Sequence, residues 1–137
     1  MRRIALLLLV TGLASCTTTP PSPTRAERSQ AELQRLISGK VAQPAVSCLP
    51  SYNANDMVVI DENTIAFRSG ATRVYISQMN GPCSNLNGAG NYALLTKQTG
   101  GTGLCRGEIA QVIDTSSNIT VGTCSFGDFV PYVRAGS

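Results

Sequence analysis

The spacing of its cysteines constrains the fold of this 137-residue chain more than any other feature. Cys48, Cys83, Cys105 and Cys124 are far apart, and the sequence contains neither histidine nor a Cys-x-x-C pair. Zinc sites usually combine close cysteine pairs with histidine, so we predict two disulfides and no metal site. Four cysteines allow three pairings. Of these we expect the nested one, in which Cys83–Cys105 closes a local hairpin and Cys48–Cys124 joins the first strand to the last.

The N-terminus has the pattern of an export signal. Arg2 and Arg3 precede the apolar run Ile4–Val10. This run is too short for a membrane-spanning helix, which needs about 20 apolar residues. It is typical of a cleaved signal peptide. Export to an oxidising compartment agrees with two disulfides.

Immediately after the apolar run, Leu13-Ala14-Ser15-Cys16 resembles the lipobox of bacterial lipoproteins. The resemblance implies cleavage of residues 1–15 and lipidation of Cys16, which accounts for the odd cysteine. Thr17 follows instead of aspartate, and by the same resemblance this implies an outer-membrane lipoprotein that faces the periplasm. We therefore expect a membrane partner through the lipid anchor, with residues 16–24 forming a Pro/Thr-rich tether.

One helix is expected, over residues 25–40. Thr24 and Glu27 have the spacing of a capping box, and Gly39 is a suitable stop. Leu33, Leu36 and Ile37 form a narrow apolar stripe. We interpret the segment as a stalk helix that docks loosely on the domain; the alternative is a helix that binds a partner beside the membrane.

Residues 44–133 have the short apolar runs and frequent turn residues of a β domain. We predict an all-β fold, a small disulfide-stapled antiparallel barrel or sandwich of about six strands. The expected strands are Met57–Ile60, Thr64–Phe67, Thr72–Met79, Tyr92–Lys97, Glu108–Asp114 and Ile119–Ser125, with Phe126–Val133 closing the chain.

The densest aromatic group in the sequence is Phe126, Phe129 and Tyr132. Side chains alternate between the two faces of a regular strand. Alternation therefore predicts that Phe126 and Phe129 lie on opposite faces of the sheet. Core packing explains most of this group, and an exposed aromatic patch would indicate a partner.

The β domain resembles a family of small, uncharacterised exported proteobacterial proteins with four domain cysteines. The similarity covers residues 48–132 and brings no activity, so it supports only the fold. It depends on Cys48, Val59-Ile60-Asp61, Phe67, Val74-Tyr75, Pro82-Cys83, Leu86, Leu104-Cys105-Arg106-Gly107-Glu108 and Cys124. The family often has aspartate at the position of Glu108.

We assign no catalytic, cofactor-binding or metal-ligating residue. Without histidine, the usual general base and the usual activator of serine or cysteine are missing. Asp56, Glu108, Asp114 and Asp128 occur singly near expected strand ends. Without Arg2 and Arg3, nine basic residues are balanced by eight acidic ones, so no nucleic-acid partner is expected.

The sequence thus predicts a binding or structural module that contacts an envelope protein through two loops, residues 84–91 and 98–103. The candidate contact residues are Asn85, Asn87, Asn91, Thr96, Lys97 and Thr102. An alternative is an inhibitor of an exported hydrolase, because Gly88-Ala89-Gly90 and Tyr92 to Lys97 resemble motifs of membrane-bound lysozyme inhibitors, although with a different spacing. An enzyme, the third possibility, would need a concave pocket that gathers at least two of the acids.

Overall fold

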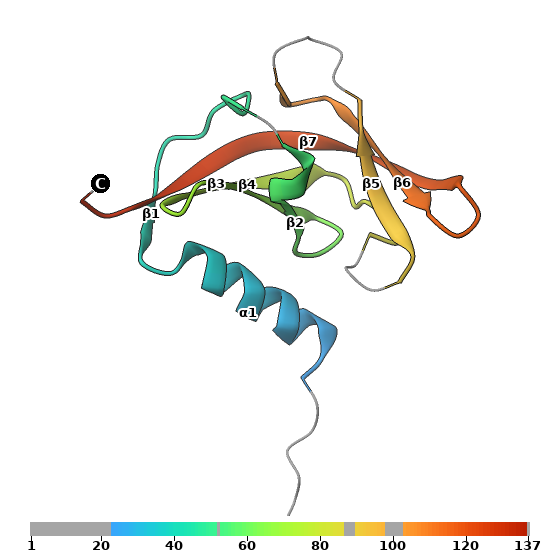
Figure 1. Ribbon diagram of the computed structural model, residues 1–137, viewed down its shortest axis with the longest axis horizontal. Helices are drawn as coiled ribbons and strands as arrows, with labels where there is room; N and C mark the ends of the chain where they lie inside the picture. Colours follow the sequence, from blue (N-terminus) through green and yellow to red (C-terminus); the bar gives the residue numbers. More distant parts are fainter. Residues whose placement is uncertain (1–22, 52, 87–89, 98–102, 137) are drawn as a thin grey trace, which may run out of the picture.

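The computed structural model describes residues 23–51, 53–86, 90–97 and 103–136. One helix precedes a set of β-strands (Figure 1). The elements are α1 (Arg25–Ile37), β1 (Lys40–Ala42), a 3-10 turn (Ala54–Asp56), β2 (Met57–Val59), β3 (Thr64–Ser69), β4 (Arg73–Asn80), β5 (Tyr92–Thr96), β6 (Ile109–Asp114) and β7 (Ile119–Arg134).

All strand pairs are antiparallel, in the order β2-β3-β4-β7-β6-β5, and β1 pairs with the C-terminal end of β7. The sheet curls into a half-barrel, with β5 and β2 at its two ends. The prediction of a mostly β, antiparallel fold with two disulfides and one N-terminal helix is confirmed. The central strand β7 is continuous over 16 residues, so the predicted division after Ser125 was wrong.

A bulge in β7 changes which side chains face the core. Ser77 pairs with Phe129 and Met79 pairs with Phe126, so two residues of β7, Gly127 and Asp128, lie opposite one residue of β4. The extra residue shifts the alternation by one position. Phe126 and Phe129 are therefore both fully buried in one core, and the prediction that they occupy opposite faces was wrong.

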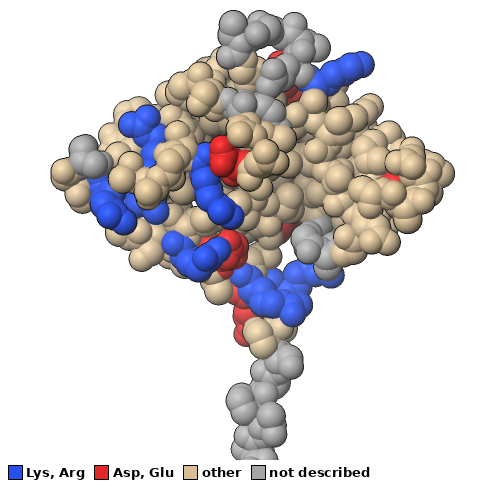
Figure 2. Space-filling model, viewed as in Figure 1, with Lys and Arg blue, Asp and Glu red and all other residues tan. Residues whose placement is uncertain are grey.

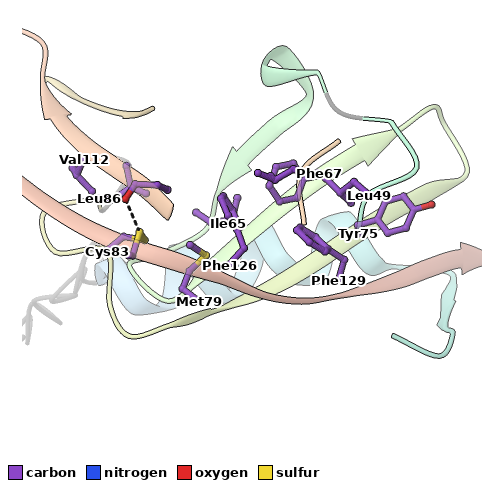
Figure 3. Packing of buried hydrophobic residues seen from close by; sticks show 13 residues of the cluster. Leu49, Ile65, Phe67, Tyr75, Met79, Cys83, Leu86, Val112, Phe126 and Phe129 are labelled. Carbon is purple, nitrogen blue, oxygen red and sulfur yellow. Dashed lines mark hydrogen bonds between the residues drawn. A yellow bond between two sulfur atoms is a disulfide. The ribbon is translucent and has the colours of Figure 1, made fainter. Parts of the chain in front are cut away.

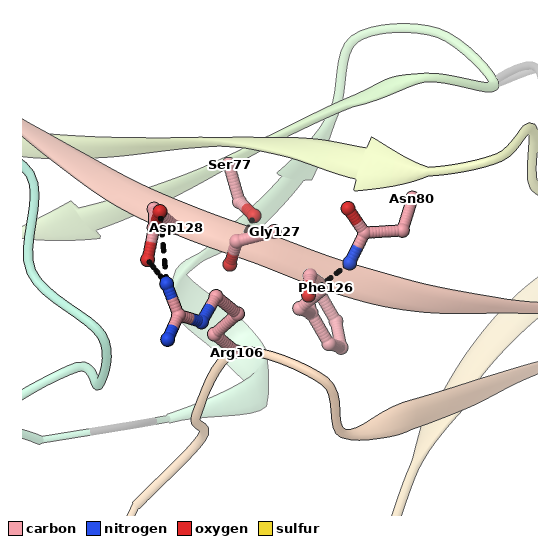
Figure 4. Close-up of polar contacts among 6 residues, drawn as sticks. All are labelled: Ser77, Asn80, Arg106, Phe126, Gly127 and Asp128. Atoms are coloured by element: carbon pink, nitrogen blue, oxygen red, sulfur yellow. Dashed lines mark hydrogen bonds and ion pairs between the residues drawn. The ribbon is translucent and has the colours of Figure 1, made fainter.

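Two side chains of the adjacent strand β4 hold this irregular backbone (Figure 4). The Asn80 side-chain amide donates to the Phe126 carbonyl at 2.9 Å, and the Ser77 hydroxyl donates to the Gly127 carbonyl at 3.4 Å. Position 127 requires glycine, because a Cβ atom there would lie 2.2 Å from the Gln78 carbonyl oxygen.

The main core lies on one face of the sheet (Figure 3). Phe67, Phe126 and Phe129 form an aromatic triad whose ring centroids are 5.8 to 6.0 Å apart. Loop residues Leu49, Leu86 and Leu104 complete this core from outside the sheet. The loops are thus part of the packing, which fixes their position relative to the strands.

Helix α1 covers the opposite face over β2, β3 and β4. Thr24 and Glu27 form the predicted capping box. Leu36 is buried against Ala66, Val74 and Ile76, and the Ser29 hydroxyl donates to the Ile60 carbonyl at 2.7 Å. The helix ends at Ile37 and not at Lys40, because Gly39 adopts a left-handed φ of 68° and Lys40 begins β1. No helix among the described residues is long and apolar enough to cross a membrane.

Candidate functional site

The two disulfides join Cys48 to Cys105 and Cys83 to Cys124, so the nested pairing predicted from the sequence was wrong. The reason is the strand order. Because β7 lies between β4 and β6, the segment after β4 lies beside β7, where Cys124 is located. Cys48 lies in an extended segment that forms an isolated antiparallel bridge with Cys105. No disulfide therefore joins Cys83 to Cys105, the pair that was predicted to close a local hairpin.

The predicted contact residues that the structure describes, Asn85, Asn91, Thr96 and Lys97, do not form one site. Asn87 and Thr102 lie outside the described residues. Asn85 adopts a left-handed φ of 71°, and its backbone amide donates to the Glu62 carboxylate at 3.1 Å. Asn91 lies just before β5, where its carbonyl accepts from the Thr115 amide.

Thr96 and Lys97 lie at the other end of β5. Thr96 is half-buried and pairs with Ala110, so it belongs to the sheet, and Lys97 is exposed directly after it. Lys97 is six residues from Asn91, which corresponds to roughly 20 Å along an extended strand. Cys16 lies outside the described residues.

The acidic side chains stabilise local structure. The Asp61 carboxylate accepts from the backbone amide of Asn63, and the Glu108 carboxylate accepts from the backbone amide of Cys105 at 2.9 Å. Asp114 accepts from the hydroxyl and amide of Ser116, and these hydrogen bonds lower its pKa. Asp128 forms an ion pair with Arg106 at 3.1 Å (Figure 4). These carboxylates hold turns and loops, and no three potential metal ligands gather within the described ranges.

An exposed surface with two large apolar side chains lies on the same face of the sheet as α1, at the end of the sheet that α1 does not cover. We define the β5–β6 surface as Leu95, Lys97, Ile109 and Gln111. Leu95 pairs with Gln111 across the two strands. Lys97 lies two residues after Leu95 and Ile109 lies two residues before Gln111, so all four side chains point away from the main core. Leu95 is 54% exposed and Ile109 is 59% exposed. Figure 2 shows few charged side chains over this end of the molecule, whereas they gather over α1 and the opposite end.

One end of this surface, at Lys97 and Ile109, is hollowed. A depression of about 490 Å³ is lined by Lys97, Arg106, Gly107, Glu108, Ile109 and Gln111. The Glu108 side chain is buried in its wall, whereas Lys97 and Arg106 are exposed at its rim. The lining of the depression thus combines the apolar side chain of Ile109 with the basic side chains of Lys97 and Arg106.

At Tyr92 and Leu94, strand β5 also has no neighbouring strand on one side within the described part of the chain. The Thr115 amide bonds to the Asn91 carbonyl, and hydrogen-bonded pairs alternate along an antiparallel ladder. The backbone groups of Ala93 and Leu95 therefore point toward β6, and those of Tyr92 and Leu94 point toward the open edge. Charged residues, prolines and bulges usually protect an exposed strand edge. The strand Tyr92–Thr96 contains none of these features.

Leu95 and Ile109 are contact candidates that the sequence analysis missed. The adjacent apolar pair Leu94 and Leu95 shows no alternation, so the sequence alone does not tell which of the two faces outward. The register with β6 decides this, because Leu94 pairs with the buried Val112.

A second depression of about 490 Å³ lies between the start of α1 and the β2–β3 turn, with Arg25, Ser29, Asp61 and Glu62 in its wall. Its carboxylates are already bonded to turn amides, Asp61 to Asn63 and Glu62 to Asn85. This depression is therefore explained by the docking of the helix on the turn.

No family model, curated protein or solved structure matches the chain. The functional argument therefore depends on the residues and geometry described above.

Proposed function

We propose that this chain is a cell-envelope lipoprotein, anchored through Cys16 to the outer membrane, whose β domain acts in the periplasm as a binding or structural module. The observation that carries the proposal is the pairing of the four domain cysteines, which leaves Cys16 as the fifth. All four cysteines of the domain are joined in disulfides, which suggests an oxidising, extracytoplasmic environment. The remaining cysteine, Cys16, stands at the end of the lipobox-like sequence.

We propose contact, and not catalysis, as the mode of action. Five acids bond to neighbouring amides, a hydroxyl or Arg106 and so support the scaffold at their present positions: Asp61, Glu62, Glu108, Asp114 and Asp128. The β5–β6 surface, in contrast, exposes apolar side chains beside an open strand edge. Exposed apolar surface beside polar groups is characteristic of protein interaction sites.

Lipidation is tested by expressing the full precursor with Cys16→Ser and following its mass and its partition into detergent. The expected result is an uncleaved or soluble precursor, whereas the parent chain is cleaved before Cys16 and carries acyl chains. Ser22→Ala, in the same segment, is the matched control and should behave like the parent. An unchanged mass and membrane fraction in the Cys16→Ser chain would refute the anchor.

A further inference from the structure

We infer that the β5 edge and the β5–β6 surface bind an extended segment of a partner protein that adds to the sheet as a strand. The inferred segment has apolar residues on its outward face and a carboxylate beside Lys97. The inference deepens the proposed role as a binding module and rests on it.

The open backbone edge supplies the first part of the argument. Tyr92 and Leu94 present N–H and C=O groups away from β6, as derived from the Thr115–Asn91 hydrogen bond. Strand addition satisfies such groups with main-chain hydrogen bonds, and pockets for alternate side chains supply specificity. Every pair in this sheet is antiparallel, so we assign the added strand the same direction.

The side chains beside the edge define the chemistry of the partner. Leu95 and Ile109 lie outward on neighbouring strands and continue toward the edge as an apolar stripe. Residues of an added strand that share the outward face would cover this stripe. The partner therefore needs apolar side chains at alternate positions.

Charge distinguishes this occupant from a second copy of the chain. Lys97 forms no ion pair with any described residue and lies at the C-terminal end of β5. In an antiparallel pairing of two β5 strands centred on Leu94, Lys97 would lie opposite Asn91 of the other copy, which has no charge. A foreign strand with an acidic residue near its N-terminus places a carboxylate there instead.

The test uses the full lipidated chain in detergent and a dye-labelled peptide with blocked ends, Asp-Thr-Val-Thr-Val-Thr. In the antiparallel register the Asp lies beside Lys97 and the valines share the face of Leu95. Fluorescence anisotropy should show saturable binding. A peptide that begins with Asn should bind about threefold more weakly, as expected for an exposed ion pair. A version with N-methylated amides at the edge-facing positions should not bind.

Three variants test whether the peptide binds at the β5–β6 surface. Leu95→Lys should weaken binding roughly tenfold, because the apolar stripe is lost. Val41→Lys is the matched control, since Val41 is 53% exposed on β1 at the other end of the sheet, and it should bind like the parent. Lys97→Glu should reverse the preference, so that a peptide beginning with Lys binds more tightly than the one beginning with Asp.

Binding that Leu95→Lys does not affect, or equal binding of the Asp and Lys peptides by the parent, would overturn the inference. A concentration-dependent dimer in sedimentation, abolished by Leu95→Lys, would assign the edge to a second copy and would also overturn it. The lipid anchor is measured independently through Cys16→Ser, so a failure of the peptide experiment leaves that part of the proposed function standing.

Discussion

Phe126 and Phe129 are three residues apart on β7, yet their rings stack in the same core with centroids 6.0 Å apart and planes inclined by 26°. A regular strand would send them to opposite faces. The bulge at Gly127 and Asp128 brings them together, so this short irregularity determines the packing of the aromatic triad with Phe67.

Gly127→Ala should destabilise the domain. The added Cβ atom would meet the Gln78 carbonyl oxygen at 2.2 Å, so β4 and β7 must separate locally. We expect a loss of about 1 to 3 kcal/mol in the free energy of unfolding, measured with urea under non-reducing conditions. Asp128→Ala, at the neighbouring position, removes only an exposed ion pair with Arg106 and should cost less than about 1 kcal/mol. Equal stability of the two variants would show that the bulge tolerates a side chain.

The disulfides should differ in their response to reductant. Cys48 is exposed and Cys105 is half-buried, whereas Cys83 and Cys124 are buried in the core. Thiolate attack requires access to a sulfur atom, so the Cys48–Cys105 bond should open first. Graded dithiothreitol, alkylation and peptide mapping of the folded chain test this order. Mapping of the untreated chain should yield the same two pairs, and a peptide that joins Cys83 to Cys105 would contradict the structure. In guanidinium the two bonds should open together.

Local features of the fold could be predicted from the sequence. The capping box of Thr24 and Glu27 depends on residues three positions apart, and the hairpin of β2 and β3 depends on the intervening turn at Asp61. Short-range hydrogen bonds and apolar periodicity determine such elements. For this reason the helix start and most strand positions were predicted correctly.

The disulfide pairing and the arrangement of the aromatic rings depend on contacts between distant segments. Cys83 meets Cys124 because β7 inserts between β4 and β6, and no local pattern specifies that order. Phe129 joins Phe126 because a bulge shifts the alternation. Leu95 was not among the predicted contact residues for a related reason, since only the register of β5 with β6 directs it outward.

Thr17→Asp should change the membrane in which the lipidated chain resides. In the proposed anchor, three acyl chains on Cys16 hold the protein in the bilayer, and each buried CH₂ group adds about 0.8 kcal/mol. The residue after the lipidated cysteine is proposed to direct sorting. We therefore expect the Thr17→Asp chain to remain lipidated but to move to the inner-membrane fraction of a density gradient, while Thr18→Asp stays with the parent. If both variants stay in the outer-membrane fraction, position 17 does not direct sorting.

The capping box at the start of α1 should be visible in the titration of Glu27. The hydrogen bond from the Thr24 backbone amide, with a second contribution from the Thr24 side chain, holds the pKa of Glu27 below its ordinary value of 4.5. A carboxyl group whose pKa is depressed in the folded state stabilises that state above the unfolded pKa, and this contribution is lost as the pH falls through the folded pKa. NMR titration of the Glu27 carboxyl carbon should therefore give a midpoint below 4.5. Thr24→Ala, which removes the hydroxyl and costs about 1 kcal/mol of helix stability, should move that midpoint upward. A midpoint at or above 4.5 in the parent chain would show that the box does not form in solution.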